Sequence, residues 1–228
     1  MTPRELIDVA EVPGGEPLRL FRRGADYMIV LERNELMNSR MSGSEEALAV
    51  MTCERLGKRK AIRMLIGGYG MGFTLRAALA ELGPDARIEV AELVPRILDW
   101  ARGPMAAMTG ECLDDPRVEI VIEDVAASIA IVAERGGLGA YDAILLDVDN
   151  GPDGLVRHEN GQLYSARGLA AAKAALTPGG VLAVWSAGGD PAFTRRLERA
   201  GFAVEEVAVK ARSNGKGPRH IIWFATKG

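Results

Sequence analysis

The stretch IGGYGMGFT, residues Ile66–Thr74, continues an apolar run that begins at Ala61. Its glycines, at positions 67, 68, 70 and 72, permit backbone with positive φ and let a ligand approach the amide groups closely. A glycine loop between a strand and a helix is typical of nucleotide-binding folds, and it suits NAD, FAD or S-adenosylmethionine equally well. A tight turn that binds no ligand is the alternative that the loop alone leaves open.

The chain on both sides of this loop alternates short apolar runs with helical patterns. The expected strands are Ala61–Ile66, Arg87–Ala91, Val118–Ile122, Tyr141–Leu146, Val181–Trp185, Phe202–Val209 and His220–Ala225. The expected helices are Phe73–Leu82, Pro95–Arg102, Val125–Glu134, Ala166–Leu176 and Pro191–Ala200. This alternation predicts an α/β, Rossmann-like fold with a mostly parallel sheet and helices on both faces. The last two strands are expected to pair as an antiparallel hairpin.

The first 43 residues have a different pattern. EPLRLFRRG and DYMIVLERNEL alternate apolar and polar residues around Arg23-Gly24, which predicts a small β-hairpin. Ser44 is expected to cap a helix over Glu45–Leu56, because two glutamates follow in its first turn. We therefore expect an N-terminal hairpin region at 1–43 and a cofactor-binding catalytic domain at 44–228.

Composition excludes several classes of protein. The 228 residues are 48% hydrophobic with a net charge of -3, which argues against broad binding to nucleic acid or anionic membranes. No segment approaches the roughly 20 apolar residues of a membrane span, and the N-terminus lacks a signal-peptide pattern. Cys53 and Cys112 are too few for a disulfide scaffold or a zinc site, so we expect no metal and a cytoplasmic protein with reduced thiols.

An acidic residue follows each of three successive parallel strands. Glu92 lies about 20 residues beyond the glycine loop, where a carboxylate accepts hydrogen bonds from ribose hydroxyls. Asp124 ends the third strand, where it is placed to accept the amino group of adenine, and Asp147 ends the fourth. Because these strand ends share one crevice, the three acids together favour an adenosine-containing ligand. Helix capping is the alternative for each acid taken singly.

These motifs resemble those of the spermidine synthase (polyamine aminopropyltransferase) family, within the S-adenosylmethionine-dependent methyltransferase superfamily. In that family GGGDGG is followed by TLRE, and here GYGMGF is followed by Thr74-Leu75-Arg76. The resemblance covers most of the chain from about residue 18 onward. Further matching segments are Glu92–Pro95 for E-[IL]-D-P, Arg117-Val118 with Glu123–Val125 for R-V…GD-[AG], Tyr141–Gly151 for YD-x-I-x-x-DS-[ST]-DP, and Leu163–Leu169 for LFTEEFY.

The resemblance implies a class I methyltransferase fold with seven strands, a small-molecule acceptor and a homodimer. It implies S-adenosyl-L-methionine, or its decarboxylated form, as cofactor. The cofactor-binding residues that it indicates are Gly68, Tyr69, Gly70, Met71, Gly72, Glu92, Leu93, Glu123, Asp124, Val125 and Asp147. Asp147, Asp149 and Asn150 are the candidate catalytic residues, because they open a long loop beside the site. Tyr69, Tyr164 and Glu46 are candidates for contacts with the acceptor.

Two departures from the family pattern change the functional prediction. The family's loop aspartate, which holds the amine of decarboxylated S-adenosylmethionine, corresponds to Met71, which accepts no useful hydrogen bond from an ammonium. A second family aspartate, which helps to hold the polyamine, corresponds to Asn150. Removing the loop carboxylate relieves repulsion of the carboxylate of ordinary S-adenosylmethionine. We therefore predict first an S-adenosylmethionine-dependent methyltransferase that acts on a small molecule.

Two other functions stay open. The first is aminopropyl transfer, with Asp149 replacing Asn150 in the amine clamp, and the second is a non-catalytic sensor or partner subunit that binds an adenosine ligand. The ring of Tyr69 is expected to line the acceptor pocket or the surface, since a tight turn offers it no burial. His158, His220 and the basic loop at 210–219 are candidate substrate contacts or ordinary surface groups. The identity of the acceptor cannot be read from the sequence.

Overall fold

The central sheet contains seven strands in the computed structural model, which describes residues 3–109, 111–136, 140–148 and 160–228. These strands are β5 (Arg63–Gly67), β6 (Arg87–Ala91), β7 (Val118–Val121), β8 (Tyr141–Leu146), β9 (Leu176–Ser186), β10 (Phe202–Lys210) and β11 (Arg219–Lys227). Their order across the sheet is β10-β11-β9-β8-β5-β6-β7, and β11 runs antiparallel to both of its neighbours. The predicted mostly parallel sheet and its final antiparallel hairpin are confirmed.

The strand order reverses between β5 and β8, because the chain proceeds from β5 to one edge through β6 and β7 and then returns to the other side. Neighbouring crossovers turn to opposite sides at such a position and leave a crevice at the carboxyl ends of the strands. The glycine loop after β5 opens at this point. The fold therefore places the loop where an α/β sheet binds its ligands.

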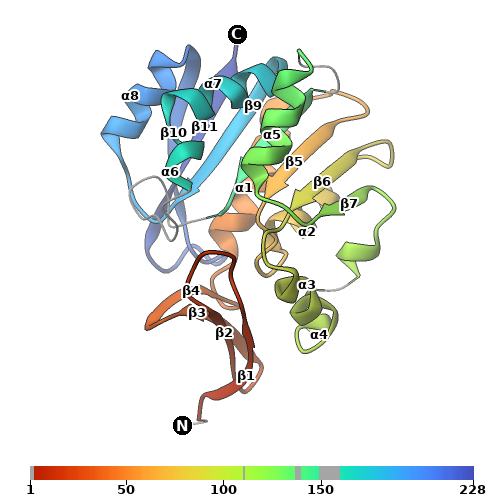
Figure 1. Ribbon diagram of the computed structural model, residues 1–228, viewed down its shortest axis with the longest axis vertical. Coiled ribbons are helices and arrows are strands. Elements are labelled where there is room, and N and C mark those ends of the chain that lie inside the picture. The colour runs from red at the N-terminus through yellow and green to blue at the C-terminus, as the bar shows by residue number, and fades with distance from the viewer. Residues whose placement is uncertain (1–2, 110, 137–139, 149–159) are drawn as a thin grey trace.

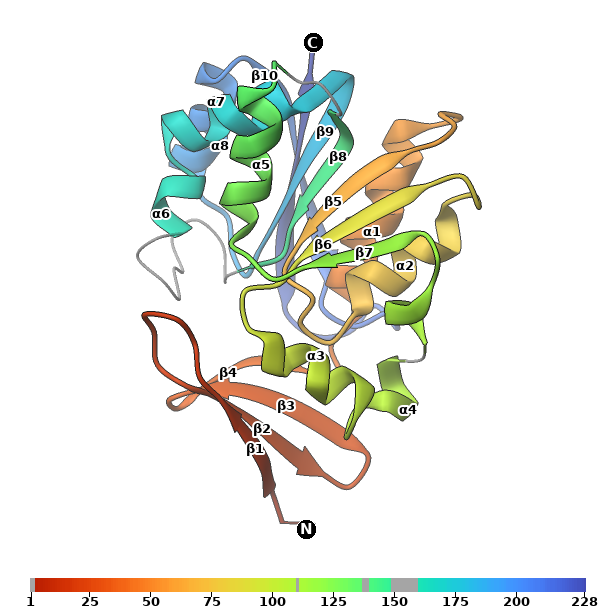
Figure 2. The same ribbon diagram turned by 45° about the vertical axis from the view of Figure 1, so that its right-hand side comes forward.

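Helices cover both faces of the sheet (Figure 2). One face carries α1 (Gly43–Leu56) and α2 (Phe73–Glu81), and the other carries α5 (Val125–Glu134), α7 (Ala166–Ala175) and α8 (Pro191–Arg199). The strands are buried on both sides because their side chains alternate between two separate apolar cores. The remaining helical segments are α3 (Pro95–Arg102), α4 (Ala106–Thr109), the 3₁₀ turn η1 (Cys112–Asp114) and α6 (Asn160–Leu163).

The N-terminal region is larger than the predicted hairpin. It is a four-stranded antiparallel sheet of β1 (Glu5–Ala10), β2 (Leu18–Arg23), β3 (Asp26–Leu31) and β4 (Asn34–Asn38), whose β2–β3 pair is the expected hairpin. It lies below the carboxyl ends of the central strands, beside α3 and α4 (Figures 1 and 2). Asp8 of β1 accepts hydrogen bonds from Arg96 Nε (2.8 Å) and Trp100 Nε1 (2.7 Å) of α3, which fixes the small sheet against the large domain.

Ser44 does not cap α1, contrary to the sequence-based prediction. The helix begins two residues earlier than predicted, at Gly43, and Ser42 occupies the N-cap position without a capping side-chain hydrogen bond. Ser44 is fully buried inside the first turn, where its hydroxyl lies 2.5 Å from Glu45 Oε2. The side chain of Ser44, which was expected to cap the start of α1, therefore belongs to a buried polar cluster.

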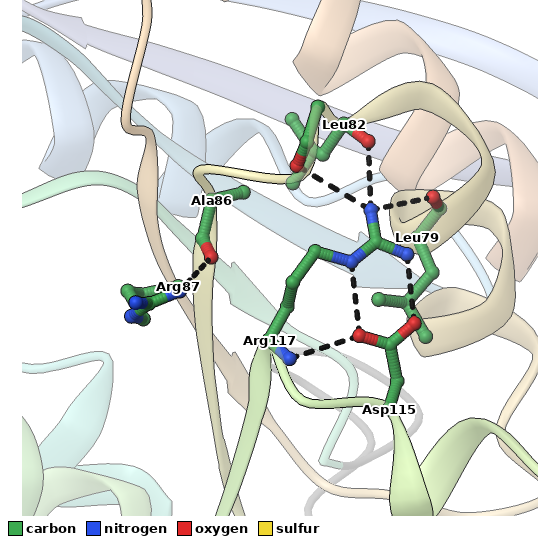
Figure 3. A network of polar contacts seen from close by, with 7 residues as sticks. Leu79, Leu82, Ala86, Arg87, Asp115 and Arg117 are labelled. Atoms are coloured by element: carbon green, nitrogen blue, oxygen red, sulfur yellow. Dashed lines mark hydrogen bonds and ion pairs between the residues drawn. The ribbon is translucent and has the colours of Figure 1, made fainter.

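Arg117 joins the start of β7 to the end of α2 (Figure 3). Its guanidinium forms two hydrogen bonds with the carboxylate of Asp115, at 2.9 and 2.8 Å, and donates to the carbonyl oxygens of Leu79 and Leu82 at 3.1 and 2.7 Å. These bonds satisfy helix-end carbonyls that lack partners within the helix.

Within the described residues no helix is long and apolar enough to cross a membrane.

Candidate functional site

Two glycines of the loop are required by its geometry. Gly68 has φ +84°, and a Cβ there would lie 2.7 Å from the carbonyl oxygen of Asp147. Gly70 has φ +55°, and a Cβ there would lie 2.7 Å from the side chain of Met37. The bare backbone thus lets the loop approach β8 on one side and the N-terminal sheet on the other.

Glu92, at the end of β6, is buried behind this loop. Its Oε2 accepts the amide of Tyr69 at 2.8 Å, and its Oε1 accepts the amide of Val94 at 2.8 Å. Burial raises the pKa of this carboxyl, while the amides of Val94 and Tyr69 oppose that rise. Glu92 therefore holds the glycine loop in place as well as lining the crevice.

Asp124 combines a capping position with a place in the crevice. Its Oδ1 accepts the amide of Ala126 at 2.9 Å and so caps α5, as the alternative interpretation of its sequence position predicted. The neighbouring Glu123 accepts a hydrogen bond from the hydroxyl of Ser128. Both acids also line the crevice, as does Val125. Capping and ligand binding are therefore not exclusive roles for Asp124.

Asp147 and Glu45 meet around Thr74. The hydroxyl of Thr74 lies 3.1 Å from Asp147 Oδ2 and 3.4 Å from the backbone carbonyl oxygen of Glu45. Burial raises the pKa of Asp147 to about 6. Burial, and then the charge of Asp147, raise the pKa of Glu45 to about 8. Two desolvated carboxyls on one cavity favour binding of a cation, because a cation stabilises their ionised forms.

These groups line a cavity of about 190 Å³ between the glycine loop and the N-terminal sheet. Its acidic lining residues are Glu16, Glu45, Glu92, Glu123, Asp124 and Asp147. Its described lining includes no Lys, Arg or His. Apolar side chains from the N-terminal sheet, such as Leu18 and Ile29, and from the β6–α3 segment, such as Val94 and Ile97, form the remaining walls. The cavity is largely apolar, and every charged group in its described lining is a carboxylate. Such a space suits a cationic ligand.

Several predicted site residues lie away from this cavity. Met71 is fully buried in the core on the α1–α2 face and is absent from the described cavity lining. Tyr69 is buried, contrary to our expectation, with its hydroxyl 3.5 Å from Cys112 Sγ. Tyr164 is buried in the other core, where its ring meets Phe193 edge-on. In the described structure Met71, Tyr69 and Tyr164 therefore pack in the protein cores and do not line the cavity.

The other predicted residues divide into three groups. Gly68, Gly70, Leu93 and Val125 line the cavity beside the acids. Gly72 has φ +72° and is the N-cap of α2, and Glu46 is partly buried in the first turn of α1. Neither residue lines the described cavity. Asp149, Asn150 and His158 lie outside the described residues. None of these placements tests a ligand contact, so the cofactor, substrate and catalytic roles remain predictions.

Sequence reasoning missed part of the cavity wall. Trp185, near the end of β9, lines the cavity, as do Leu31, Leu36 and Met37 of the N-terminal sheet. The alternation in β2 and β3 predicts an apolar face, but it does not identify what that face covers. The described residues include no cluster of His, Cys, Asp and Glu suited to a metal ion.

Polyamine aminopropyltransferases are among the proteins that this chain resembles in sequence. No family model matches the chain. The polyamine aminopropyltransferase of Mycobacterium tuberculosis (strain ATCC 25618 / H37Rv) is 34% identical over 151 residues, which are 62% of this chain and 27% of that protein. The polyamine aminopropyltransferase of Aeropyrum pernix is 30% identical over 119 residues, 52% of this chain and 35% of that protein. This chain therefore spans only about a quarter to a third of the length of these relatives.

A methyltransferase and two solved structures complete the comparison. The ribosomal RNA small subunit methyltransferase H of Halorhodospira halophila is 29% identical over 166 residues, 69% of this chain and 48% of that protein. Spermidine synthase from Thermotoga maritima has a TM-score of 0.74 at 19% identity, over 98% of this chain and 73% of that one. A spermidine synthase in complex with the transition state analogue AdoDATO has a TM-score of 0.73 at 20% identity, over 98% and 72%. The resemblance in sequence and the spermidine synthase fold are confirmed.

Proposed function

We propose that this chain is a transferase that moves the aminopropyl group of decarboxylated S-adenosylmethionine to a small amine. The observation that carries the proposal is the charge of the cavity, whose described lining is acidic at several positions and basic at none. The named relatives and the spermidine synthase fold support aminopropyl transfer over the methyl transfer that we predicted first. Residues 1–43 would cover the cavity of a catalytic domain at 44–228.

The acidic lining distinguishes the two donors. Both carry a sulfonium, but ordinary S-adenosylmethionine adds a carboxylate, which would enter a cavity lined by Asp147 and Glu45 and with no Lys, Arg or His in its described lining. An unpaired buried charge costs several kcal/mol. Decarboxylated S-adenosylmethionine presents an ammonium alone, which these carboxylates attract. Met71 packs in the core, so its lack of a carboxylate does not favour S-adenosylmethionine, and the described cavity offers carboxylates from other elements.

The residues around the cavity are suited to distinct parts of the reaction. Glu92 is placed to accept hydrogen bonds from the ribose of the donor, and Asp124 to accept the amino group of its adenine. Gly68 lets the backbone approach the nucleoside, and the apolar walls exclude water. Asp147 would hold an amine for in-line attack on the methylene carbon beside the sulfonium. The bond from that carbon to sulfur then breaks, and methylthioadenosine leaves.

Methyl transfer to a small molecule is the second candidate. It is favoured by the similarity to the ribosomal RNA small subunit methyltransferase H of Halorhodospira halophila. It would use S-adenosyl-L-methionine in the same cavity.

A homodimer and a cytoplasmic location, both drawn from the sequence, remain predictions.

Calorimetry with the two donors tests the proposal. We expect decarboxylated S-adenosylmethionine to bind at least about 10-fold more tightly than S-adenosylmethionine, which corresponds to about 1.4 kcal/mol. Incubation with short diamines should then produce methylthioadenosine. The variant D147N should reduce the preference between donors, whereas E54Q, an exposed glutamate on α1, serves as a matched control.

Tighter binding of S-adenosylmethionine, followed by methylation of an acceptor, would favour the second candidate. Tight binding of methylthioadenosine without turnover across a panel of amines would favour the non-catalytic sensor. Absence of binding by all three nucleosides would overturn the placement of the cofactor in this cavity.

A further inference from the structure

A chain of hydrogen bonds leads from the cavity to the last strand of the sheet. Glu45 lines the cavity, and its Oε2 lies 2.5 Å from the hydroxyl oxygen of Ser44. The same hydroxyl oxygen lies 2.9 Å from Nδ1 of His220, at the start of β11. Three groups from two elements far apart in sequence are thus joined inside the protein. Neither capping of α1 nor the proposed cofactor contacts use this arrangement.

His220 lies between the buried carboxyl and the surface. Its ring meets the indole of Trp185 edge-on, with 4.8 Å between ring centroids, and Trp185 lines the cavity. His220 is partly exposed, whereas Ser44 is fully buried. Burial lowers the pKa of His220, so its imidazole is neutral at pH 7 and able to accept a proton. The chain therefore has one end in the cavity and one end near water.

The Ser44 hydroxyl has one proton and can orient it in two ways. When Glu45 is ionised, Ser44 donates to the carboxylate and His220 donates from Nδ1. When Glu45 is protonated, the carboxyl donates to Ser44, and Ser44 donates to Nδ1 of His220. Reversal of both hydrogen bonds carries one proton from Glu45 to His220. The two observed distances, 2.5 and 2.9 Å, suit either orientation.

We propose that Glu45, Ser44 and His220 form the proton exit of the active site, which rests on the proposed aminopropyl transfer. An acceptor amine enters as an ammonium and must lose one proton before its lone pair attacks. Glu45 takes that proton, and it passes through Ser44 to His220 and then to water. The new C–N bond forms as the C–S bond breaks with its electron pair on sulfur. One proton leaves per transfer, which balances the reaction.

The surroundings of Glu45 favour it over Asp147 as the proton acceptor. Asp147 has Thr74 as its described hydrogen-bond partner, and Thr74 leads back to the backbone of α1. Glu45 lies near Asp147 on the cavity lining, has Glu46 beside it on α1 and connects to His220 through Ser44. The described strand neighbours of His220 are Val209 of β10 and the adjacent basic residue Arg219. A base with a raised pKa, near 8, is better matched to an amine than an ordinary carboxylate is.

Variants that interrupt the exit test the inference. H220N keeps a hydrogen-bonding group beside Ser44 but cannot take up a proton, and S44A removes the middle link. We expect each to lower kcat for aminopropyl transfer about 10- to 100-fold, within the usual range for proton-transfer groups. The affinity for methylthioadenosine should stay within about 2-fold of wild type, because neither residue lines the described cavity. E54Q should behave as wild type.

Rescue separates proton transfer from a structural role. Added imidazole should restore a large part of kcat in H220N, because it can replace the missing base at the partly exposed end of the chain. It should not restore S44A, in which the buried link is absent, or accelerate wild type. Wild-type kcat in H220N and S44A would overturn the inference while leaving the proposed function intact. A wild-type protein without aminopropyl transfer would instead overturn the proposed function, and the proton exit with it.

Discussion

Asp124 uses one carboxylate oxygen to cap α5 and turns toward the cavity at the same position. The two roles make different demands on its chemistry. A cap needs one acceptor oxygen, and asparagine supplies it as well as aspartate does. Recognition of the adenine amino group needs a second acceptor, which asparagine replaces by an amide donor. Substitutions at this one position can therefore separate folding from binding.

We predict that D124N leaves the free energy of unfolding within about 0.5 kcal/mol of wild type, because the cap to Ala126 is kept. The affinity for methylthioadenosine should fall about 10-fold, since the amide would face the adenine amino group. D124A should lose the cap as well, at about 1 kcal/mol. Calorimetry and chemical denaturation measure the two effects. Unchanged nucleoside affinity in both variants would leave Asp124 as a cap alone.

Single residues show where sequence reasoning reaches its limit. The position of Glu92 and Asp147 on the cavity follows from strand ends and the crevice rule. Met71 is buried and does not line the described cavity, because a motif gives the position of a residue in a loop but not the direction of its side chain, and its contact with a ligand stays a prediction. Glu45 lies in the first turn of α1 as the sequence predicts, but its raised pKa comes from burial and then from the charge of Asp147, which is distant in sequence.

At the scale of elements, Arg117 and Asp115 connect α2 to β7. The sequence singled out Arg117 through a family motif without giving it a role. In the structure its guanidinium is mostly buried and bonds both a carboxylate and helix-end carbonyls (Figure 3). The paired guanidinium lowers the pKa of Asp115 to about 2. This network is remote from the cavity lining, so it is expected to affect stability and not chemistry.

We predict that R117A lowers the free energy of unfolding by about 1.5–3 kcal/mol, since hydrogen bonds to a charged group are lost and helix-end carbonyls lose their partner. R117K should recover a part of this, because a point-like ammonium cannot reproduce the planar fork. R87A, which removes an exposed arginine of the same region, is the matched control and should cost less than about 0.5 kcal/mol. Denaturant titration measures all three. Equal losses for R117A and R87A would contradict the network.

Most elements could be predicted because their patterns are local. Arg87–Ala91, Pro95–Arg102, Val125–Glu134 and Tyr141–Leu146 have the expected bounds. The N-terminal sheet could not be predicted in full, because the pairing of β1 and β4 depends on partners elsewhere and both pairings contain a register irregularity. β9 begins at Leu176, whereas the expected strand began at Val181, because Leu176 pairs with Tyr141 across an irregular register.

At the scale of the molecule, the two sheets enclose a space whose charges are unbalanced. The N-terminal sheet contributes apolar walls, and several strand ends of the central sheet and the helix α1 contribute acids. For each buried acid on the cavity whose pKa is raised, the folded state favours the protonated form more than the unfolded state does. The protein therefore stores an unfavourable charge interaction at neutral and higher pH, which a bound cation relieves.

Stability without ligand should consequently fall as pH rises. The pKa of Glu45 is raised from 4.5 to about 8, so its stabilising contribution is complete below pH 4.5 and is lost as pH rises through 8. His220, whose pKa is lowered, acts in the opposite direction only at pH values below its unfolded value of 6.5. Between pH 6.5 and 8.5 we therefore predict a loss of about 1–2 kcal/mol in the free energy of unfolding. E45Q should remove most of this slope, and E54Q should retain it.

Methylthioadenosine with a diamine should raise Tm more at pH 8.5 than at pH 6.5, because the cation then meets two ionised carboxylates. A wild-type stability that is flat over this range, or an E45Q variant with the full slope, would show that the cavity acids are not desolvated as described.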